Sequence, residues 1–331
     1  MHLPDGYLSP ETCTAFGAAM VPFWVAAARR VRKIVRSRYV PLLAIGAAYC
    51  FLVMMFNVPI PDGTTAHAVG GVLVAVLLGP WAAVIAVSTA LGIQALFFGD
   101  GGVLAFGANC FNMALVMPMV GYGVYLVLSR RVPLTSARRP LAAGIGAYVG
   151  LNVAALCAAI ELGIQPALFH SANGTPLYAP FHLAQTIPAM ALAHLTVAGA
   201  VEFALTAGVI AYLQRANLPL LCINHGAVPD LEADVPPARR LRWRGAVIGL
   251  GVMAVLTPLG LVAPGRAFGE SAPNRLHTLL NGYDFTHDRH PSVGYLLSAG
   301  FGMLIIALLT FAAYALVRIA RRVRAGQKAV V

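Results

Sequence analysis

The N-terminal amine and two histidines of this chain could together bind one metal ion through nitrogen atoms. Met1 carries an α-amine, and His2 supplies a backbone amide nitrogen and an imidazole on the same short segment. Coordination by these three groups closes a five-membered and a six-membered chelate ring around one ion. An imidazole nitrogen of His67 would complete a plane of four, and tetragonal nitrogen ligation suits Ni(II) or Cu(II), with Co(II) near them in affinity.

Such a site requires that the first residue be retained with a free amine. A bulky residue after methionine generally protects the methionine from removal, and His2 is bulky. The opening segment lacks the basic region of a cleavable signal, and Pro4 and Gly6 oppose early helix formation. We therefore expect the encoded N-terminus to be the mature one. Residue type alone favours a different interpretation, because a histidine at position 2 more commonly belongs to a disordered terminus.

The composition is that of a membrane protein. Of the 331 residues, 59% are hydrophobic and 11% are charged, and the mean hydropathy is +0.77. Uncharged apolar stretches recur along the whole chain, and most reach the ~20 residues that a helix needs to cross a bilayer. Because a spanning segment must satisfy its backbone polar groups internally, the sequence predicts an all-α, polytopic helical membrane protein.

The apolar stretches predict about nine transmembrane helices, seven plus two. Their expected ranges are 10–29, 39–57, 67–79, 80–98, 103–129, 140–162, 184–214, 245–263 and 293–317. The least obvious division lies within 67–98, because one helix there would be about 48 Å long, too long for the bilayer. Gly79-Pro80 offers a break. Short, interrupted helices of this kind often line a substrate cavity in transporters.

Basic residues predict an outside N-terminus and a cytoplasmic C-terminus. With that orientation, 20 of the 23 lysines and arginines lie in the inner segments 29–38, 130–139, 215–244 and 318–331. Cytoplasmic loops carry such an excess. The net charge of +11 is therefore a topology signal with added attraction to membrane lipid, and no nucleic-acid partner is expected. We predict a multi-pass protein of the cell (inner) membrane with the candidate metal site on its outer side.

Several separated motifs occur between residues 62 and 113. They are Gly63-Thr64-Thr65-Ala66-His67-Ala68-Val69-Gly70-Gly71, Leu78-Gly79-Pro80-Trp81-Ala82-Ala83, Gly99-Asp100-Gly101-Gly102, Gly107-Ala108-Asn109 and Asn112-Met113. Together with the opening Met1-His2-Leu3-Pro4-Asp5-Gly6-Tyr7-Leu8-Ser9-Pro10, they resemble the CbiM/NikM family. Members of that family are the substrate-binding membrane subunits of cobalt/nickel importers of the energy-coupling-factor type. The resemblance covers about residues 1–215.

The resemblance implies a specific ligand set and substrate. The metal ligands would be the amine of Met1, the amide and imidazole of His2, and the imidazole of His67. Ni²⁺ or Co²⁺ would be the transported substrate, and no prosthetic group is implied. The family usually has Thr-Ser where this chain has Thr64-Thr65, a change that retains a hydroxyl. Ni(II) accepts square-planar geometry somewhat better than Co(II), but the sequence leaves the preference open.

The C-terminal region shows a second resemblance. The segments Thr257-Pro258-Leu259-Gly260-Leu261-Val262-Ala263-Pro264-Gly265 and Phe268-Gly269-Glu270-Ser271 are similar to the small accessory subunit of these systems (CbiN/NikN or PDGLE type). The literal Pro-Asp-Gly-Leu-Glu signature is absent, which leaves the subgroup open. The expected organisation is a metal-binding transmembrane module at 1–215, a cytoplasmic linker at 216–243 and a two-helix accessory module at 244–331.

Polar residues within the predicted helices are further candidates. Asn109 and Asn112 lie three residues apart and so share a helical face. They would either join helices by hydrogen bonds or hold the N-terminal loop or His67 in place. His194 and Glu202 also share a face, and intramembrane ionisable residues are functional candidates by default. These two residues could act near the metal pocket, contact another subunit, or serve only in packing and hydrogen bonding.

Loop residues complete the candidate pocket. Asp5, Thr64 and Thr65 are candidates for its lining, and Asp5 and Asp100 either shape outer loops around the site or are ordinary turn residues. The predicted outer loop 264–292 contains three histidines, which would either capture metal transiently or simply be solvated. They are His277, His287 and His290.

The chain is expected to be a transporter subunit and not an enzyme. It has no Gly-x-x-x-x-Gly-Lys-[Ser/Thr] loop. The resemblance implies a transmembrane coupling subunit (CbiQ/NikQ-like) and cytoplasmic ATPase subunits (CbiO/NikO-like) as partners. A secondary transporter of a small solute, without an ATPase partner, is the alternative. Since both imidazoles must be neutral to bind metal, affinity is expected to fall as the pH drops through the imidazole range near ~6.5.

Overall fold

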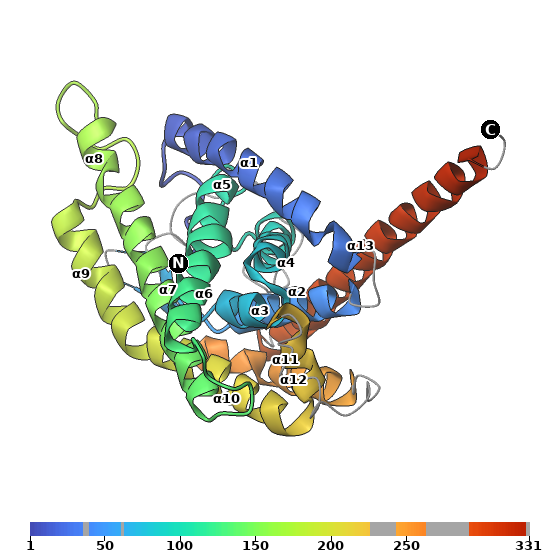
Figure 1. Cartoon of the computed structure of the whole chain (residues 1–331). Helices are drawn as coiled ribbons and strands as arrows, with labels where there is room; N and C mark the ends of the chain where they lie inside the picture. Colours follow the sequence, from blue (N-terminus) through green and yellow to red (C-terminus); the bar gives the residue numbers. More distant parts are fainter. Residues whose placement is uncertain (36–39, 61–62, 226–242, 263–290, 329–331) are drawn as a thin grey trace.

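The computed structural model describes residues 1–35, 40–60, 63–225, 243–262 and 291–328. This part of the chain is mostly helical, as predicted, with one short pair of strands (Figure 1). The elements are α1 (Pro10–Val35), α2 (Val40–Met54), β1 (Val58–Pro59), β2 (Thr65–Ala66), α3 (Gly71–Leu78), α4 (Pro80–Ile93), η1 (Gln94–Phe98), α5 (Phe106–Asn109), η2 (Cys110–Val116), α6 (Met117–Leu128), α7 (Arg138–Gly163), α8 (Gln165–Leu168), α9 (Leu183–Ala193), η3 (His194–Ala198), α10 (Gly199–Ala216), α11 (Leu218–His225), α12 (Trp243–Leu256), η5 (Thr257–Val262) and α13 (Pro291–Lys328). Of the short η segments, η1, η2 and η3 are π-helical turns, and η5 is a 3₁₀ helix.

Helices long and apolar enough to cross a membrane recur through the described part of the chain. Five helical segments there meet both criteria, namely Pro80–Phe98, Phe106–Leu128, Arg138–Leu168, Leu183–Ala216 and Ser292–Leu316. Two shorter apolar helices lie at Val40–Met54 and Val247–Leu259. Each of the nine predicted helical ranges contains a helix. The number of membrane crossings and the orientation of the termini stay predictions.

The predicted break at Gly79-Pro80 is confirmed. Helix α3 ends at Leu78 and α4 begins at Pro80. Gly79 has a φ of 93°, which residues with a Cβ rarely adopt. Proline at the first position of α4 loses no hydrogen bond, because the N–H groups of a first helical turn have no partner within the helix. The break therefore follows from two adjacent residues, a glycine with a positive φ and a proline whose ring fixes a negative φ.

The short strand pair is a departure from the all-α prediction, and it changes the place of His67. Val58 pairs with Ala66 and Pro59 with Thr65 in an antiparallel register. His67 follows β2 directly and lies in a loop, so the prediction that a helix begins at residue 67 was wrong. The helix starts only after Gly70, which has a φ of 76° and caps it. A Cβ on Gly70 would overlap the Tyr49 ring, so the turn before α3 requires glycine.

The predicted linker 216–243 begins with a helix. Residues 218–225 form α11, which packs against α3. Leu221 is buried, and the Asn224 side-chain amide donates to the carbonyl oxygens of Ala75 (3.1 Å) and Val76 (3.3 Å). These carbonyls belong to the last turn of α3, where the Ala75 carbonyl also accepts the N–H of Gly79 (2.9 Å). Residues 226–242 lie outside the described part of the chain.

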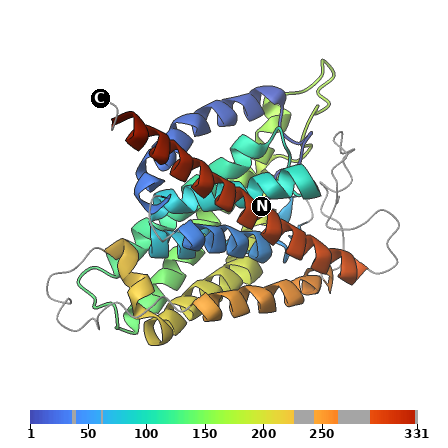
Figure 2. The same cartoon turned by 90° about the vertical axis from the view of Figure 1, so that its right-hand side faces the viewer.

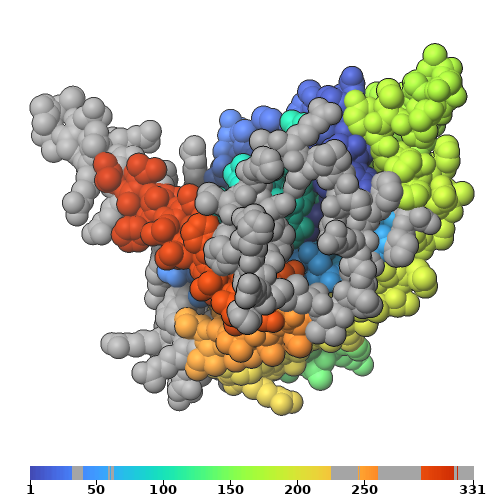
Figure 3. Space-filling view, turned by 180° about the vertical axis from the view of Figure 1, so that it is seen from behind, coloured from blue at the N-terminus to red at the C-terminus, as the bar shows by residue number. Residues whose placement is uncertain are grey.

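The C-terminal helices lie against the N-terminal part of the molecule. Helices α12 and α13 both pack on α2, and the C-terminal end of α13 extends beyond the other helices (Figure 2). Figure 3 shows α12 in orange across the lower part of that face of the molecule. Gly245 of α12 faces the hydroxyl of Tyr212 in α10. The predicted outer loop 264–292 lies almost wholly outside the described residues. So do the Phe268–Ser271 motif and His277, His287 and His290.

The N-terminus lies at the centre of the helical body and not at its edge (Figure 1). Met1 and Leu3 have no exposed surface, and His2 is 4% exposed. Because termini are usually exposed and poorly ordered unless something ties them down, the interpretation of His2 as part of a disordered terminus does not fit this structure. The segment before α1 is instead built into the core.

Candidate metal centre

Asn109 holds the N-terminal segment through both atoms of its side-chain amide. Its oxygen accepts the Leu3 N–H (2.8 Å), and its nitrogen donates to the Leu3 carbonyl (3.0 Å). The same carbonyl accepts the N–H of Gly102 (2.8 Å). Leu3 is therefore paired as if it lay in a sheet, one residue after His2. The interpretation of Asn109 as a residue that holds the N-terminal loop agrees with this geometry.

Replacing Asn109 with alanine is expected to weaken Ni²⁺ binding by about 10- to 100-fold, the usual effect of removing a residue that orients metal ligands. The substitution removes two hydrogen bonds from the backbone next to His2. Isothermal titration calorimetry of the purified protein with Ni²⁺ measures the change in affinity. Asn152→Ala is the matched control, because the Asn152 amide donates only to the Tyr148 carbonyl (2.8 Å) within its own helix. Equal affinities of the two variants would contradict the role of Asn109.

Asp5 fixes the loop that faces the N-terminal segment. Its carboxylate accepts the N–H groups of Val103 (3.0 Å), Leu104 (2.9 Å) and Ala105 (3.2 Å), just before α5. A Cβ on Gly102 would overlap this carboxylate, which explains glycine at that position. Of the two interpretations of Asp5, the geometry agrees with the shaping of an outer loop.

The Met1 amine is buried against the predicted Thr64-Thr65 pair. It donates to the carbonyl oxygen of Thr65 and to its hydroxyl (3.0 Å), and the Thr65 N–H contacts the Thr64 hydroxyl. Burial lowers the pKa of the amine to about 4, although the nearby Asp100 carboxylate opposes the shift. The amine is then neutral near pH 7. Its two N–H bonds point to Thr65, and its lone pair is available to a metal.

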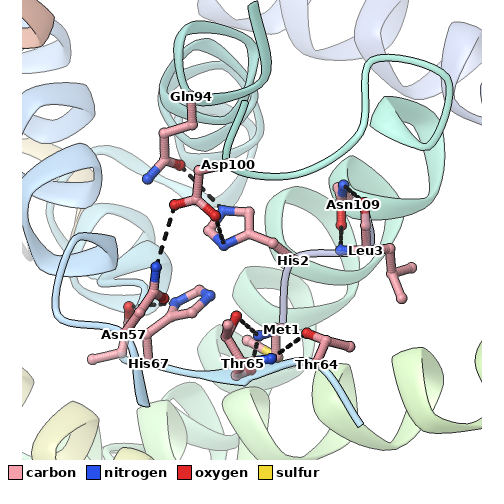
Figure 4. A network of polar contacts seen from close by, with 11 residues as sticks. Met1, His2, Leu3, Asn57, Thr64, Thr65, His67, Gln94, Asp100 and Asn109 are labelled. Carbon is pink, nitrogen blue, oxygen red and sulfur yellow. Dashed lines mark hydrogen bonds and ion pairs between the residues drawn. The ribbon is translucent and has the colours of Figure 1, made fainter. Parts of the chain in front are cut away.

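The two predicted imidazoles lie side by side next to this amine (Figure 4). The rings of His2 and His67 are stacked, with centroids 4.5 Å apart. His2 Nε2 lies 3.3 Å from Gln94 Oε1, and His2 Nδ1 lies 3.2 Å from Asp100 Oδ1. His67 Nδ1 lies 3.0 Å from the Ala68 carbonyl, while its Nε2 is buried without a hydrogen-bond partner. Since a carbonyl can only accept, Nδ1 of His67 carries the proton and Nε2 presents a lone pair.

Burial keeps both imidazoles neutral. It lowers the pKa of His2, with the Asp100 carboxylate acting in the opposite direction, and it lowers the pKa of His67 well below the ordinary value. The amine and His2 add to the effect on His67 when they are charged. A lowered pKa means that protons compete for these nitrogens only in more acidic solution. The expected loss of metal affinity therefore moves below the range near ~6.5 of an ordinary imidazole.

His194 and Glu202 both lie close to His67. The His194 Nδ1 is 2.8 Å from the Met190 carbonyl, and its Nε2 is buried without a hydrogen-bond partner. Charge on His194 also contributes to the lowered pKa of His67. The Glu202 carboxylate accepts the N–H of Val69 (2.7 Å), two residues after His67. The interpretation that places both residues near the metal pocket agrees with these contacts.

Asn112 does not share the role of Asn109. Its amide nitrogen donates to Glu161 Oε2 in α7 (2.9 Å), so it joins two helices, as the alternative interpretation proposed. The π-helical turn η2 begins at Cys110, between the two asparagines. Because a π turn pairs residues i and i+5, the three-residue spacing no longer places both side chains in one environment. The shared face stays a prediction, while the two side chains bind different partners.

Gln94 and Asp100 contact His2, and Asn57 contacts Asp100. The sequence analysis did not identify Gln94 or Asn57. Asn57 donates to Asp100 Oδ2 (3.4 Å), and Gln94 is fully buried. A signal for Gln94 was present, because an amide in an apolar membrane stretch must find a partner. The π-helical turns η1 and η3 begin at Gln94 and His194, and π turns often occur at functional sites.

A cluster of side chains alone does not account for the site. Within the described residues, no group of three or more histidine, cysteine, aspartate or glutamate side chains is arranged to hold a metal ion. The candidate ligand set, by contrast, takes two of its four nitrogens from the main chain at Met1 and His2. The structure brings these two residues and His67 together at the buried centre of the molecule.

Known proteins similar to this chain are metal transporters. The model of the family "Cobalt uptake substrate-specific transmembrane region" (CbiM) matches residues 2–220. The "Fused nickel transport protein NikMN" of Rhodobacter capsulatus is 54% identical over 82% of this chain and 75% of that protein. The "Probable fused nickel transport protein LarMN" of Lactiplantibacillus plantarum is 45% identical over 93% of this chain and 96% of that protein.

A solved structure agrees with these relatives. It is described as the crystal structure of a truncated transition metal transporter, with 59% sequence identity and a TM-score of 0.62, and the match covers 64% of this chain and 98% of that one. The family model spans the described helices that surround the candidate site. The chain therefore belongs to the CbiM family of cobalt uptake substrate-specific transmembrane proteins.

Proposed function

We propose that this chain is the substrate-capture component of an ATP-driven cobalt/nickel importer, which binds Ni²⁺ or Co²⁺ through the Met1 amine, the amide and imidazole of His2, and His67. One observation carries the proposal. The Met1 amine is fully buried beside two stacked imidazoles, and burial lowers its pKa to about 4. Burying an amine and two imidazoles costs free energy, and a bound metal ion would offset that cost.

The proposed organisation follows the fused relatives. Residues 1–215 form the metal-binding module, 216–243 a cytoplasmic linker, and 244–331 an accessory module of the CbiN/NikN type. Nine crossings of the inner membrane would place the N-terminus outside and the C-terminus inside, in agreement with the positions of the basic residues. The metal site then faces the side from which an importer takes its substrate.

The proposed partners are a transmembrane coupling subunit and cytoplasmic ATPase subunits. The family description and the relatives' names support a role in metal uptake. The chain itself carries no phosphate-binding loop of the Walker type. Energy for uptake would thus come from another subunit, which drives the release of the captured ion toward the cytoplasm.

The experiment measures uptake of radioactive nickel and cobalt by cells that lack their own importers of these metals. The chain is expressed with its coupling and ATPase subunits, and in parallel with an ATPase whose phosphate-binding lysine is replaced. We expect uptake only with the active ATPase. Uptake at the same rate with the inactive ATPase would identify a secondary transporter, and the absence of uptake with the complete system would refute the proposed function.

A further inference from the structure

We propose that Glu202 is a positioning residue that orients His67 for metal binding through a single peptide unit. This inference rests on the proposed function, in which His67 supplies one of the metal ligands. It assigns the buried carboxylate a defined task, and it explains how helix α10 acts on a histidine that lies far away in the sequence.

The carboxylate of Glu202 binds the backbone directly after His67. It has no exposed surface. Its Oε2 accepts the N–H groups of Val69 (2.7 Å) and Gly70 (3.0 Å), and its Oε1 lies 3.2 Å from the Gly70 nitrogen. The segment between His67 and α3 is therefore attached firmly to α10.

One peptide unit connects this carboxylate to the imidazole. The Val69 N–H and the Ala68 carbonyl belong to the same planar peptide group. The N–H donates to Glu202, while the carbonyl accepts the Nδ1 proton of His67 (3.0 Å). Fixing the N–H fixes the plane, and the plane fixes the direction of the carbonyl. Glu202 thus holds the Ala68–Val69 peptide group, and this peptide group holds the Nδ1–H of His67. The lone pair at Nε2 of the same ring is left free.

This arrangement has two effects on His67 as a ligand. It selects the tautomer with the proton on Nδ1, which leaves Nε2 for the metal. It also polarises the peptide group, because hydrogen bonds in series strengthen one another. Histidine ligands in proteins usually donate their second nitrogen to a carboxylate or carbonyl, which sets ring orientation and raises basicity. Here a carboxylate and a carbonyl act together on one ring.

A purely structural role for Glu202 would be to cap α3. Gly70 is the N-cap of that helix and has no side chain to bind the free N–H groups. A negative charge near the N-terminus of a helix is stabilising. Both roles use the same hydrogen bonds, so the stability of the fold does not separate them. The tautomer of His67 and the absorption spectrum of the bound metal separate the two roles, because a residue that only caps α3 would affect neither of them.

The test replaces Glu202 with glutamine, which has the same shape but only one acceptor oxygen. Its amide oxygen is a weaker acceptor than a carboxylate oxygen, and its amide nitrogen repels the Gly70 N–H, so the peptide group is held less tightly. We expect Ni²⁺ affinity to fall about 10- to 100-fold, with a shifted visible absorption band of the bound ion. Nitrogen NMR of the metal-free protein should show His67 as a mixture of tautomers in place of the Nδ1–H form alone.

Glu161→Gln is the matched control. Glu161 is also a buried carboxylate in a helix, but it accepts its hydrogen bond from the Asn112 amide (2.9 Å) and not from the backbone that follows His67. It should leave the His67 tautomer and the absorption band unchanged. If Glu202→Gln does not fold, Glu202→Asp retains the carboxylate one methylene further away and should give an intermediate affinity and tautomer ratio.

The outcomes separate this proposal from the proposed function. A Glu202→Gln protein with the native tautomer and native absorption band overturns the positioning role, as does an equal effect of Glu161→Gln on both. If the native chain binds neither Ni²⁺ nor Co²⁺, the proposed function fails instead. The tautomer measured without metal still decides whether Glu202 orients His67.

Discussion

One additional residue before Met1 is expected to abolish metal binding while the protein remains folded and inserted in the membrane. The extension converts the amine into an amide and removes both a lone pair and a chelate ring. The amine is also fully buried and donates to two atoms of Thr65, so the extra residue has no space beside it. Loss of a ligand should exceed the effect of about 100-fold that removal of an orienting residue can have.

Elemental analysis measures this effect directly. The native and extended chains are incubated with equal concentrations of Ni²⁺ and Co²⁺, separated from free metal and analysed. We expect one equivalent of metal on the native chain and none on the extended chain, and the metal retained shows the preference between nickel and cobalt. Equal loading of both chains would place the metal elsewhere in the molecule.

His67→Ala is expected to have a comparably large effect. The substitution removes the nitrogen that would complete the plane, and it leaves the amine and His2 as an incomplete ligand set. Nε2 of His67 has no hydrogen-bond partner in the protein, so it is free to bind the ion. We expect its removal to lower Ni²⁺ affinity by more than about 100-fold.

The matched control is His170→Ala. His170 is an exposed histidine whose Nδ1 lies 3.1 Å from the Ser171 carbonyl, so its environment contrasts with the buried site. Equilibrium binding and the visible spectrum of the Ni²⁺ complex are measured for both variants. Retained affinity and spectrum in His67→Ala, or an equal loss in His170→Ala, would contradict the assignment of His67 as a ligand.

Local sequence was enough to predict the class of the molecule and most of its helical stretches. Long uncharged stretches are expected to form helices in a bilayer, because a helix pairs the backbone N–H and C=O groups within a single segment where no water is available. The break at Gly79-Pro80 was equally readable, because it depends on the backbone geometry of two adjacent residues. These features arise from interactions over a few residues, which local sequence records.

Contacts between segments that are distant in the sequence assemble the candidate site. Glu202 and Val69 are 133 residues apart in the chain, and His2 meets Gln94 across 92 residues. The sequence shows that such polar groups need partners in an apolar interior, but many partners satisfy that need equally well. The π-helical turn at Cys110 and the strand pair before His67 likewise depend on packing between distant helices. Residue types thus indicated which atoms could bind metal, and long-range packing brought them to one place.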